Sequence, residues 1–436
     1  MTLKTERIHM TRQPLDPSPR TYAANVQLLA RSQRGPACAP DAQTLEDVKN
    51  WLLNDATEID DVMLMFEEFM WRCQAAHLDI DRSTLHIGTL HPRVIGFSWF
   101  WSAQDSFCDE LAADANALQH EAFTKNPLYK VMAEGEFVKV DLETKEGLNA
   151  FPIMRDLAEQ GYTNYVAIPL SASGTMNNAM TLATTRKGGI SPEQKEEIRS
   201  LIELFALHVE RHIVKRIARN VADTYLGPIA GQRVLDGEIK RGDGEAIDAV
   251  VFMSDMRGFT GLADRLSGAE VTAILNAYFD RVSTAVLNHG GDILKFMGDG
   301  VLAVFDQKTL GRQAAADAAV NAARAVLSSI DELNDAPSDT LPDPALWHPL
   351  KIGIGLHMGE VFFGNVGGEE RLDFTVIGRA VNETSRVEAL CKPLGQTLLL
   401  TEPVRSALPD GLKSGLDPMG DHVLRGVGNP VAIFSA

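Results

Sequence analysis

The 436-residue sequence has little of what marks disulfide-stabilised, membrane-spanning or nucleic-acid-binding proteins. Its four cysteines, Cys38, Cys73, Cys108 and Cys391, fit neither metal-ligand spacing nor a disulfide framework. No stretch reaches the roughly 18 uninterrupted apolar residues of a membrane span, and the N-terminus lacks the pattern of a signal peptide. Acidic residues outnumber basic ones by 59 to 41, and the net charge of −18 argues against a nucleic acid or an anionic membrane as the main partner. These absences predict a soluble cytoplasmic protein.

The length allows two or three domains, and composition divides the chain into four segments. Residues 1–43 mix Arg, Pro, Ser and Gln without periodicity, which predicts a flexible tail. Residues 44–215 carry the helical and strand patterns of an α/β domain. Residues 216–245 are rich in glycine and charge and are expected to be a linker, and residues 246–436 form a second domain.

The first domain is expected to begin with amphipathic helices between Thr44 and Ala76 and to end with a long helix from Ser191-Pro192. Between them the patterns predict strands at residues 94–101, 135–142, 165–173 and 176–186 and a helix at residues 108–123. This order of elements resembles the GAF fold, which implies a small-molecule effector. The alternative is a dimerisation module that binds no ligand.

The second domain contains two acids, Asp255 and Asp299, that each end an apolar run and are followed closely by glycine. Residues 250–252 predict a buried strand, and residues 293–296 and 301–305 predict a hairpin with Asp299 in its turn. If the strand lies beside the hairpin, both carboxylates emerge at one sheet edge. Acids before glycine often serve turns alone. Two at strand ends favour a site for Mg²⁺ or Mn²⁺, which keep positions for water and phosphate oxygens.

The segment Met256-Arg257-Gly258-Phe259-Thr260 is expected to lead into a helix that begins near Gly261, where backbone N–H groups can cradle phosphates. Further along, the order of elements is βαββαβ with extra strands. It predicts an α+β sandwich with helices on one face of a mainly antiparallel sheet.

Four strings in this domain resemble the class III nucleotidyl cyclase catalytic domain: SDMRGFT, KFMGDGVLAVF, GLHMGEVFFGNVG and RLDFTVIGRAVNETSR. The resemblance covers about residues 246–436 and implies a ferredoxin-like, palm-type domain. It also implies two metal ions, Mg²⁺ or Mn²⁺, held by Asp255, Asp299 and the backbone carbonyl of Met256. The family forms homodimers with two equivalent sites at the interface.

The same resemblance assigns residues to the base of the nucleotide. Lys295 and Thr375 match the pair that recognises adenine, whereas guanylyl cyclases of the family typically carry an acid and a small residue there. A lysine cannot accept a hydrogen bond from the guanine N1–H and amino group, so ATP is expected over GTP.

The resemblance also assigns residues to the ribose and the phosphates. Asn382 and Arg386, four residues apart on one predicted helix, match the asparagine that orients the ribose and the arginine that stabilises charge on the α-phosphate. Without the resemblance they would be an ordinary solvated helix face. Arg425 stands where the family usually has a phosphate-binding lysine. Arg379 replaces an Asp or Asn that is common after TVIG, and the sequence suggests no role for it.

The sequence therefore predicts an adenylate cyclase, a lyase that converts ATP into 3′,5′-cyclic AMP and pyrophosphate and is regulated by its N-terminal domain. One alternative is a nucleotide-binding signalling module without catalysis, which the retention of both acids, Asn382 and Arg386 disfavours. A guanylyl cyclase is the other alternative. The triplet Gly290-Gly291-Asp292 superficially suggests a diguanylate cyclase. That alternative is disfavoured because the triplet lies before the hairpin and is followed by Ile-Leu-Lys in place of Glu-Phe.

Overall fold

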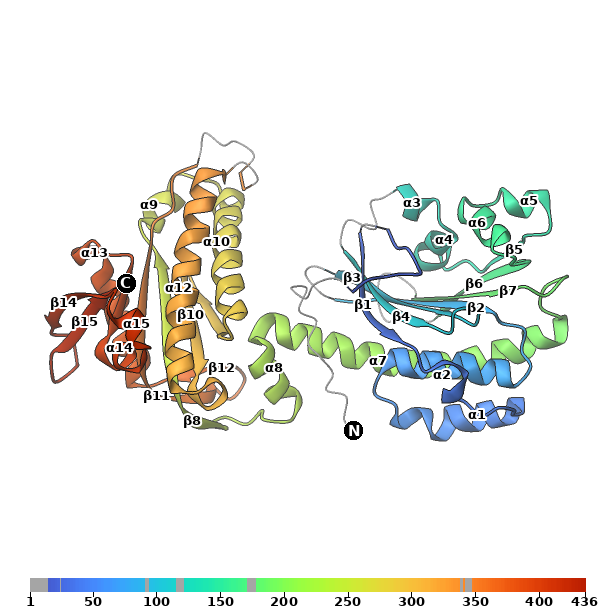
Figure 1. Cartoon of the computed structure of the whole chain (residues 1–436), viewed down its shortest axis with the longest axis horizontal. Coiled ribbons are helices and arrows are strands. Elements are labelled where there is room, and N and C mark those ends of the chain that lie inside the picture. The colour runs from blue at the N-terminus through green and yellow to red at the C-terminus, as the bar shows by residue number, and fades with distance from the viewer. Residues whose placement is uncertain are drawn as a thin grey trace. The chain divides into compact units, whose positions relative to one another are not determined.

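The computed structural model describes residues 15–23, 25–90, 94–114, 121–170, 178–337, 340–341 and 347–436 (Figure 1). Contacts divide the chain into two compact units, Met1–Val221 and Ala222–Ala436. The division falls within the segment that we expected to be a linker, and helix α7 (Pro192–Leu226) runs through it. Within the described ranges, no helix has the length and apolar character needed to cross a bilayer.

The first unit is built on a seven-stranded antiparallel sheet in the order β1-β4-β3-β2-β7-β6-β5. Its strands are β1 (Val26–Ser32), β2 (Arg82–Gly88), β3 (Val94–Ser102), β4 (Cys108–Asp114), β5 (Val138–Asp141), β6 (Asn164–Leu170) and β7 (Asn178–Thr184). Besides α7, its helices are η1 (Gly35–Cys38), α1 (Leu45–Asn54), η2 (Ala56–Glu58), α2 (Val62–Ala75), α3 (Glu121–Thr124), α4 (Pro127–Glu134), α5 (Lys145–Leu148) and α6 (Ile153–Glu159).

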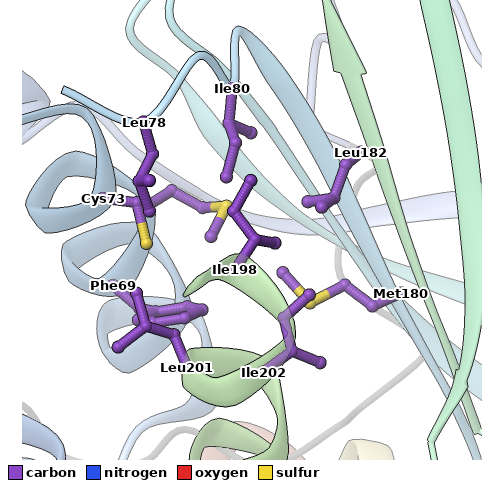
Figure 2. A pocket seen from close by; sticks show the side chains of 10 residues that line it. Phe69, Cys73, Leu78, Ile80, Met180, Leu182, Ile198, Leu201 and Ile202 are labelled. Atoms are coloured by element: carbon purple, nitrogen blue, oxygen red, sulfur yellow. The ribbon is translucent and has the colours of Figure 1, made fainter. Parts of the chain in front are cut away.

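The main core of this unit lies between the sheet and helices α1, α2 and α7. Alternate side chains of β3, among them Trp99 and Trp101, turn toward the helices, and Phe69 of α2 stacks on Phe205 of α7 with ring centroids 4.4 Å apart. A narrow space in this core is lined by apolar side chains and Cys73 and admits no water molecule (Figure 2). It is therefore core packing rather than a ligand site. The predicted helices between Thr44 and Ala76 and the predicted strands 94–101, 135–142, 165–173 and 176–186 are confirmed in their described parts.

Two expectations for this unit are wrong. Residues 108–114, expected to belong to a helix over residues 108–123, form β4, which lies between β1 and β3, whereas residues 121–123 at the end of that range are helical in α3. Strand pairing on both sides outweighs the helix propensity of Ala and Leu there. Residues 26–32, expected to be in a flexible tail, form β1 and pair with β4. Residues 1–14, 24 and 115–120, on which these two expectations also fell, lie outside the described residues.

The segment before β1 is held to the sheet by a buried carboxylate. The side chain of Asp109 on β4 is fully buried and accepts hydrogen bonds from Arg20 at 3.0 Å, Tyr22 at 2.6 Å and Arg31 at 2.6 Å. Arg20 also donates to Asp105 at 2.6 and 2.7 Å. The partners of Asp109 are separated from it by 78 to 89 residues in the chain, so no local pattern could reveal them.

This carboxylate is expected to make stability depend on pH. Burial by itself raises the pKa of Asp109, but the hydrogen bonds from Arg31 and Tyr22 and the charge of Arg20 outweigh it and lower the pKa below its usual value. Such a group stabilises the fold above its unfolded pKa and loses this contribution as the pH falls through its folded pKa. We expect Asp109→Asn to cost about 2–4 kcal/mol at pH 7. The cost should shrink as the pH falls below about 4.

Urea unfolding followed by tryptophan fluorescence measures this cost, because four of the five tryptophans lie in this unit. Asp60→Asn is the matched control, since the Asp60 carboxylate is 83% exposed where it meets Lys215. Equal unfolding midpoints for wild type and Asp109→Asn at pH 7 would refute the prediction.

The second unit is built on an eight-stranded sheet in the order β14-β15-β13-β11-β8-β10-β9, with β12 paired to β11. Its strands are β8 (Gly244–Met256), β9 (Asp292–Met297), β10 (Gly300–Asp306), β11 (Ile352–Gly367), β12 (Leu372–Ile377), β13 (Leu398–Thr401), β14 (Asp417–His422) and β15 (Val431–Ser435). Its helices are α8 (Pro228–Leu235), α9 (Phe259–Ala263), α10 (Gly268–Asn288), α11 (Gln307–Leu310), α12 (Arg312–Asp335), α13 (Arg379–Leu394), α14 (Glu402–Ala407) and α15 (Asp410–Lys413). The predicted βαββαβ order and the mainly antiparallel sheet are confirmed, and among the described strands only β11 and β13 pair in parallel.

Helices cover both faces of this sheet, which corrects the expectation of helices on one face. Helices α10 and α12 lie side by side on one face (Figure 1). Helix α13 packs on the other face, where a Cβ at Gly355 would come within 2.5 Å of the Glu388 backbone nitrogen. Glycine at this position lets the helix approach the strand, and no pattern in either element shows on which face they meet.

Two boundaries also differ from expectation. The helix expected near Gly261 begins at Phe259 and ends at Ala263, and α10 starts afresh after Ser267, whose side chain caps it by accepting from the Glu270 N–H. Helix α8 lies within the expected linker, where the buried Ala230 joins the core on the α13 side of the sheet.

Candidate active site

Strand β8 and the β9–β10 hairpin bring Asp255 and Asp299 to the same sheet edge. Asp255 is the penultimate residue of β8 and faces Gly300, the residue after Asp299, across the ladder. Gly298 adopts a left-handed conformation with φ of +65°, which lets the chain reverse in a two-residue turn. The turn thus presents the second acid beside the end of the central strand.

The neighbouring carboxylate of Asp299 influences the protonation of Asp255. Burial raises the pKa of Asp255, and the neighbouring charge of Asp299 raises it further. A divalent cation between them would relieve both effects. Among the described residues, no group of three or more His, Cys, Asp or Glu side chains is placed to hold a metal, so these two side chains supply a sparse ligand set. A site with two carboxylate ligands leaves the other coordination positions of the metal for water and phosphate oxygens, as Mg²⁺ and Mn²⁺ prefer.

A third acid, Glu388 on α13, lies close to this pair and was not apparent from the sequence. Burial raises its pKa to about 7, and the charge of Asp255 raises it while that of Arg257 lowers it. The Glu388 carboxylate lies beside Gly353, which faces Asp255 across the ladder, and a Cβ at Gly353 would come within 2.5 Å of it. Only the packing of α13 against β11 reveals this neighbour.

The residues expected to recognise the base lie on β9 and β12, which are in contact. The ammonium group of Lys295 forms an ion pair with the carboxylate of Asp373, two residues before Thr375 on the same face of β12. Thr375 is buried, with 7% of its surface exposed, and the Lys295 side chain is 32% exposed. The structure therefore brings Lys295 close to the strand face that carries Thr375. The contact is made through Asp373, to which the sequence pattern assigned no role.

Helix α13 carries Asn382, which is exposed, and Arg386, which is half-buried. Within the described part of the chain, neither side chain makes a hydrogen bond or ion pair, and neither contacts Asp255 or Asp299 in this way. Arg425 lies exposed in the turn between β14 and β15. Within the described residues of one chain, no hydrogen bond or ion pair joins these groups to the paired acids.

Gly258, Phe259 and Thr260 follow directly after the first acid. Gly258 has a φ of +77° and precedes α9, which begins at Phe259. Because α9 has only five residues, the helix dipole invoked from the sequence is small, and any phosphate contact there depends on the backbone N–H groups themselves.

Comparison with known proteins identifies this domain. Residues 244–434 match the family described as the adenylate and guanylate cyclase catalytic domain. An adenylate cyclase of Anabaena cylindrica is 33% identical over 186 residues, which are 43% of this chain and 35% of that enzyme. Among solved structures, the adenylyl cyclase CyaB from P. aeruginosa is 30% identical, with 44% of this chain and 95% of that chain covered and a TM-score of 0.38. The guanylyl cyclase Cya2 is 31% identical, with 44% and 92% covered and a TM-score of 0.38.

Residues 244–434 therefore form a catalytic domain of the class III adenylyl and guanylyl cyclase family. It spans about a third of the length of the Anabaena relative. Both adenylyl and guanylyl cyclases are among the similar proteins. Because the family's description covers both adenylate and guanylate cyclases, the choice of nucleotide depends on the residues of this chain.

Proposed function

We propose that the protein is an adenylyl cyclase that converts ATP into 3′,5′-cyclic AMP and pyrophosphate at the interface of a homodimer, with two Mg²⁺ or Mn²⁺ ions at each site. The observation that carries the proposal is the pairing of Asp255 and Asp299 at one sheet edge of a cyclase domain. Both side chains offer carboxylate oxygens, the ligands that these hard cations prefer.

The reaction requires the ribose 3′-oxygen to attack the α-phosphorus, with loss of the 3′-hydroxyl proton and departure of pyrophosphate. Asp255, Asp299 and the Met256 carbonyl would hold the metal ions, which would lower the pKa of the hydroxyl and neutralise charge on the triphosphate. The backbone from Gly258 to Thr260 and the guanidinium of Arg425 would contact the phosphates.

Asn382 and Arg386 supply the remaining interactions. Asn382 would orient the ribose by hydrogen bonds, and Arg386 would stabilise the charge that develops on the α-phosphate. Both side chains project from α13 without partners in the described part of one chain. We therefore place them in the site of the partner protomer, so that each site takes its acids from one chain and its asparagine and arginine from the other.

ATP is proposed as the substrate because of Lys295 and Thr375. A threonine hydroxyl can accept from the adenine amino group, whereas a lysine cannot accept from the guanine N1–H. The ion pair with Asp373 holds the Lys295 ammonium group beside β12, where Thr375 lies.

We expect Lys295→Ala to lower kcat/KM for ATP by about 10²-fold, because the loss leaves both the base and Asp373 without a partner. The measurement is steady-state formation of cyclic AMP. Lys308→Ala is the matched control, since the Lys308 side chain is 76% exposed in its ion pair with Glu245 in the same domain. A change below twofold in Lys295→Ala would remove Lys295 from the base site.

Product identification tests the proposed function as a whole. The full chain is incubated with Mn²⁺ and either ATP or GTP, and the products are separated by chromatography. Cyclic AMP from ATP is expected. Cyclic GMP from GTP as the sole cyclic product would replace the proposal with a guanylyl cyclase, and no cyclic product from either nucleotide would leave a nucleotide-binding signalling module.

We also propose that the first unit, with its GAF-like order of elements, regulates catalysis in response to a small-molecule effector. The continuous helix α7 supports this, because it starts in the first unit and ends within the first residues of the second.

A further inference from the structure

Arg379, for which the sequence suggested no role, is one end of a buried polar network under α13. Its guanidinium donates to one carboxylate oxygen of Glu383, one turn later on the helix. The other Glu383 oxygen lies 3.2 Å from Nε2 of His357 on β11. Nδ1 of His357 lies 2.9 Å from the hydroxyl of Thr401, the last residue of β13. The network thus ties the first turn of α13 to two strands.

Most groups of this network are buried, so each of them needs a hydrogen-bonding or charged partner. The side chains of Glu383 and His357 are 8% and 9% exposed, and Thr401 is fully buried, whereas Arg379 is 76% exposed. A buried carboxylate is unfavourable unless charge and hydrogen bonds compensate it, and here Arg379 supplies the charge while His357 supplies the second hydrogen bond.

The protonation states are mutually consistent. Burial lowers the pKa of His357 below its usual value, against the opposing charge of Glu383, so the ring is neutral near pH 7. A neutral imidazole can donate from Nε2 to Glu383 and accept from the Thr401 hydroxyl at Nδ1. Each polar group of the network then has a partner suited to it.

The network acts at the start of α13, beside the buried Ala380, which packs against Gly359 of β11 but offers no polar anchor. Gly378, which precedes the helix, provides no side-chain cap, and the close contact at Gly355 involves Thr384 and Glu388, further along. Asn382 is adjacent to Glu383 but is exposed, without a partner in the described residues. Its direction therefore depends on how the first turn of α13 is held.

We propose that Glu383, held between Arg379 and His357, is a positioning residue that sets the rotation of the first turn of α13 and so aims Asn382 at the ribose of the substrate. The inference deepens the proposed function and rests on it. Because Glu383 acts through Asn382, its loss should slow the chemical step more than it weakens nucleotide binding.

The first test is kinetic, on the full chain with ATP and Mn²⁺. Glu383→Ala is expected to lower kcat about 10- to 100-fold with KM changed less than about threefold. Glu383→Gln, which keeps the shape and one hydrogen-bond acceptor, should recover part of the loss. The control is Lys392→Ala, which removes an exposed charged side chain from the last turn of the same helix and should match wild type. Unchanged kcat in Glu383→Ala, or a rise in KM alone, would overturn the inference.

The second test separates positioning from a general structural role by mixing inactive or weakened variants. Glu383→Ala mixed with Asp255→Ala should regain activity, because one hybrid site then has an intact acid pair and an intact α13. Glu383→Ala mixed with Asn382→Ala should not, because both defects fall in the same half of the site. Equal behaviour of the two mixtures would overturn the inference.

The reference mixture is Asp255→Ala with Asn382→Ala. If this reference does not regain activity, the shared-site arrangement of the proposed function fails. If it does and the mixture of Glu383→Ala with Asp255→Ala does not, only the role of Glu383 fails.

Discussion

Asp255→Ala and Asp299→Ala are each expected to lower cyclic AMP formation at least about 10³-fold, because either change removes half of the side-chain ligands for the metal ions. Burial and the charge of Asp299 disfavour the ionised form of Asp255, and we expect the cations to need both carboxylates. The measurement is turnover of ATP with Mn²⁺ and, separately, with Mg²⁺.

Folding has to be intact for this result to bear on the site. Circular dichroism and the unfolding midpoint of each variant should match those of wild type or exceed them, since each change removes one of two repelling charges. Asp264→Ala, an exposed acid just after α9, is the matched control and should retain full activity. Turnover within tenfold of wild type in either Asp255→Ala or Asp299→Ala would exclude the proposed metal site.

Mixing Asp255→Ala with Asn382→Ala, each inactive alone, is expected to restore about a quarter of wild-type activity. Random pairing makes about half of the dimers mixed, and each mixed dimer has one intact site of two. The expectation rests on the proposed shared site, because Asn382 is exposed on α13 and, within the described residues of one chain, makes no hydrogen bond or ion pair with the acids of the sheet edge. The measurement is cyclic AMP formation as a function of the mixing ratio, with a maximum at equal amounts.

The control mixture is Asp255→Ala with Asp299→Ala. Both acids belong to one chain's sheet edge, so every possible dimer lacks an intact pair and no activity should return. Activity in this control, or its absence in the Asp255→Ala and Asn382→Ala mixture, would contradict a site shared in the proposed way.

Local patterns were sufficient where the physical cause is local. The hairpin from Asp292 to Asp306 follows from two apolar runs separated by glycine-containing turn residues, and α12 and α13 follow from helical spacing. The two acids could be located because each ends such a run. For the same reason the predicted order of elements in the second unit agrees with the structure.

Contacts between residues that are distant in the sequence could not be predicted from local patterns. Asp373 meets Lys295 across 78 residues, and Glu388 approaches the acids only because glycines of β11 admit α13 closely. The helix expected at residues 108–123 failed because pairing with β1 and β3 decided its conformation.

By itself, the amino-acid sequence determined the order of the main strands and helices of the catalytic domain and the two acids of its sheet edge, because periodicity and turn chemistry act over a few residues. Its family followed from the resemblance of its motifs. Tertiary structure alone decided that Arg20 and β1 are anchored to Asp109, that α13 lies opposite α10 and α12, and that Glu383 meets His357 of β11. The physical reason is burial. A buried carboxylate is stable only when charged or hydrogen-bonding groups compensate it. Those groups can come from distant parts of the chain, so the local sequence does not identify them.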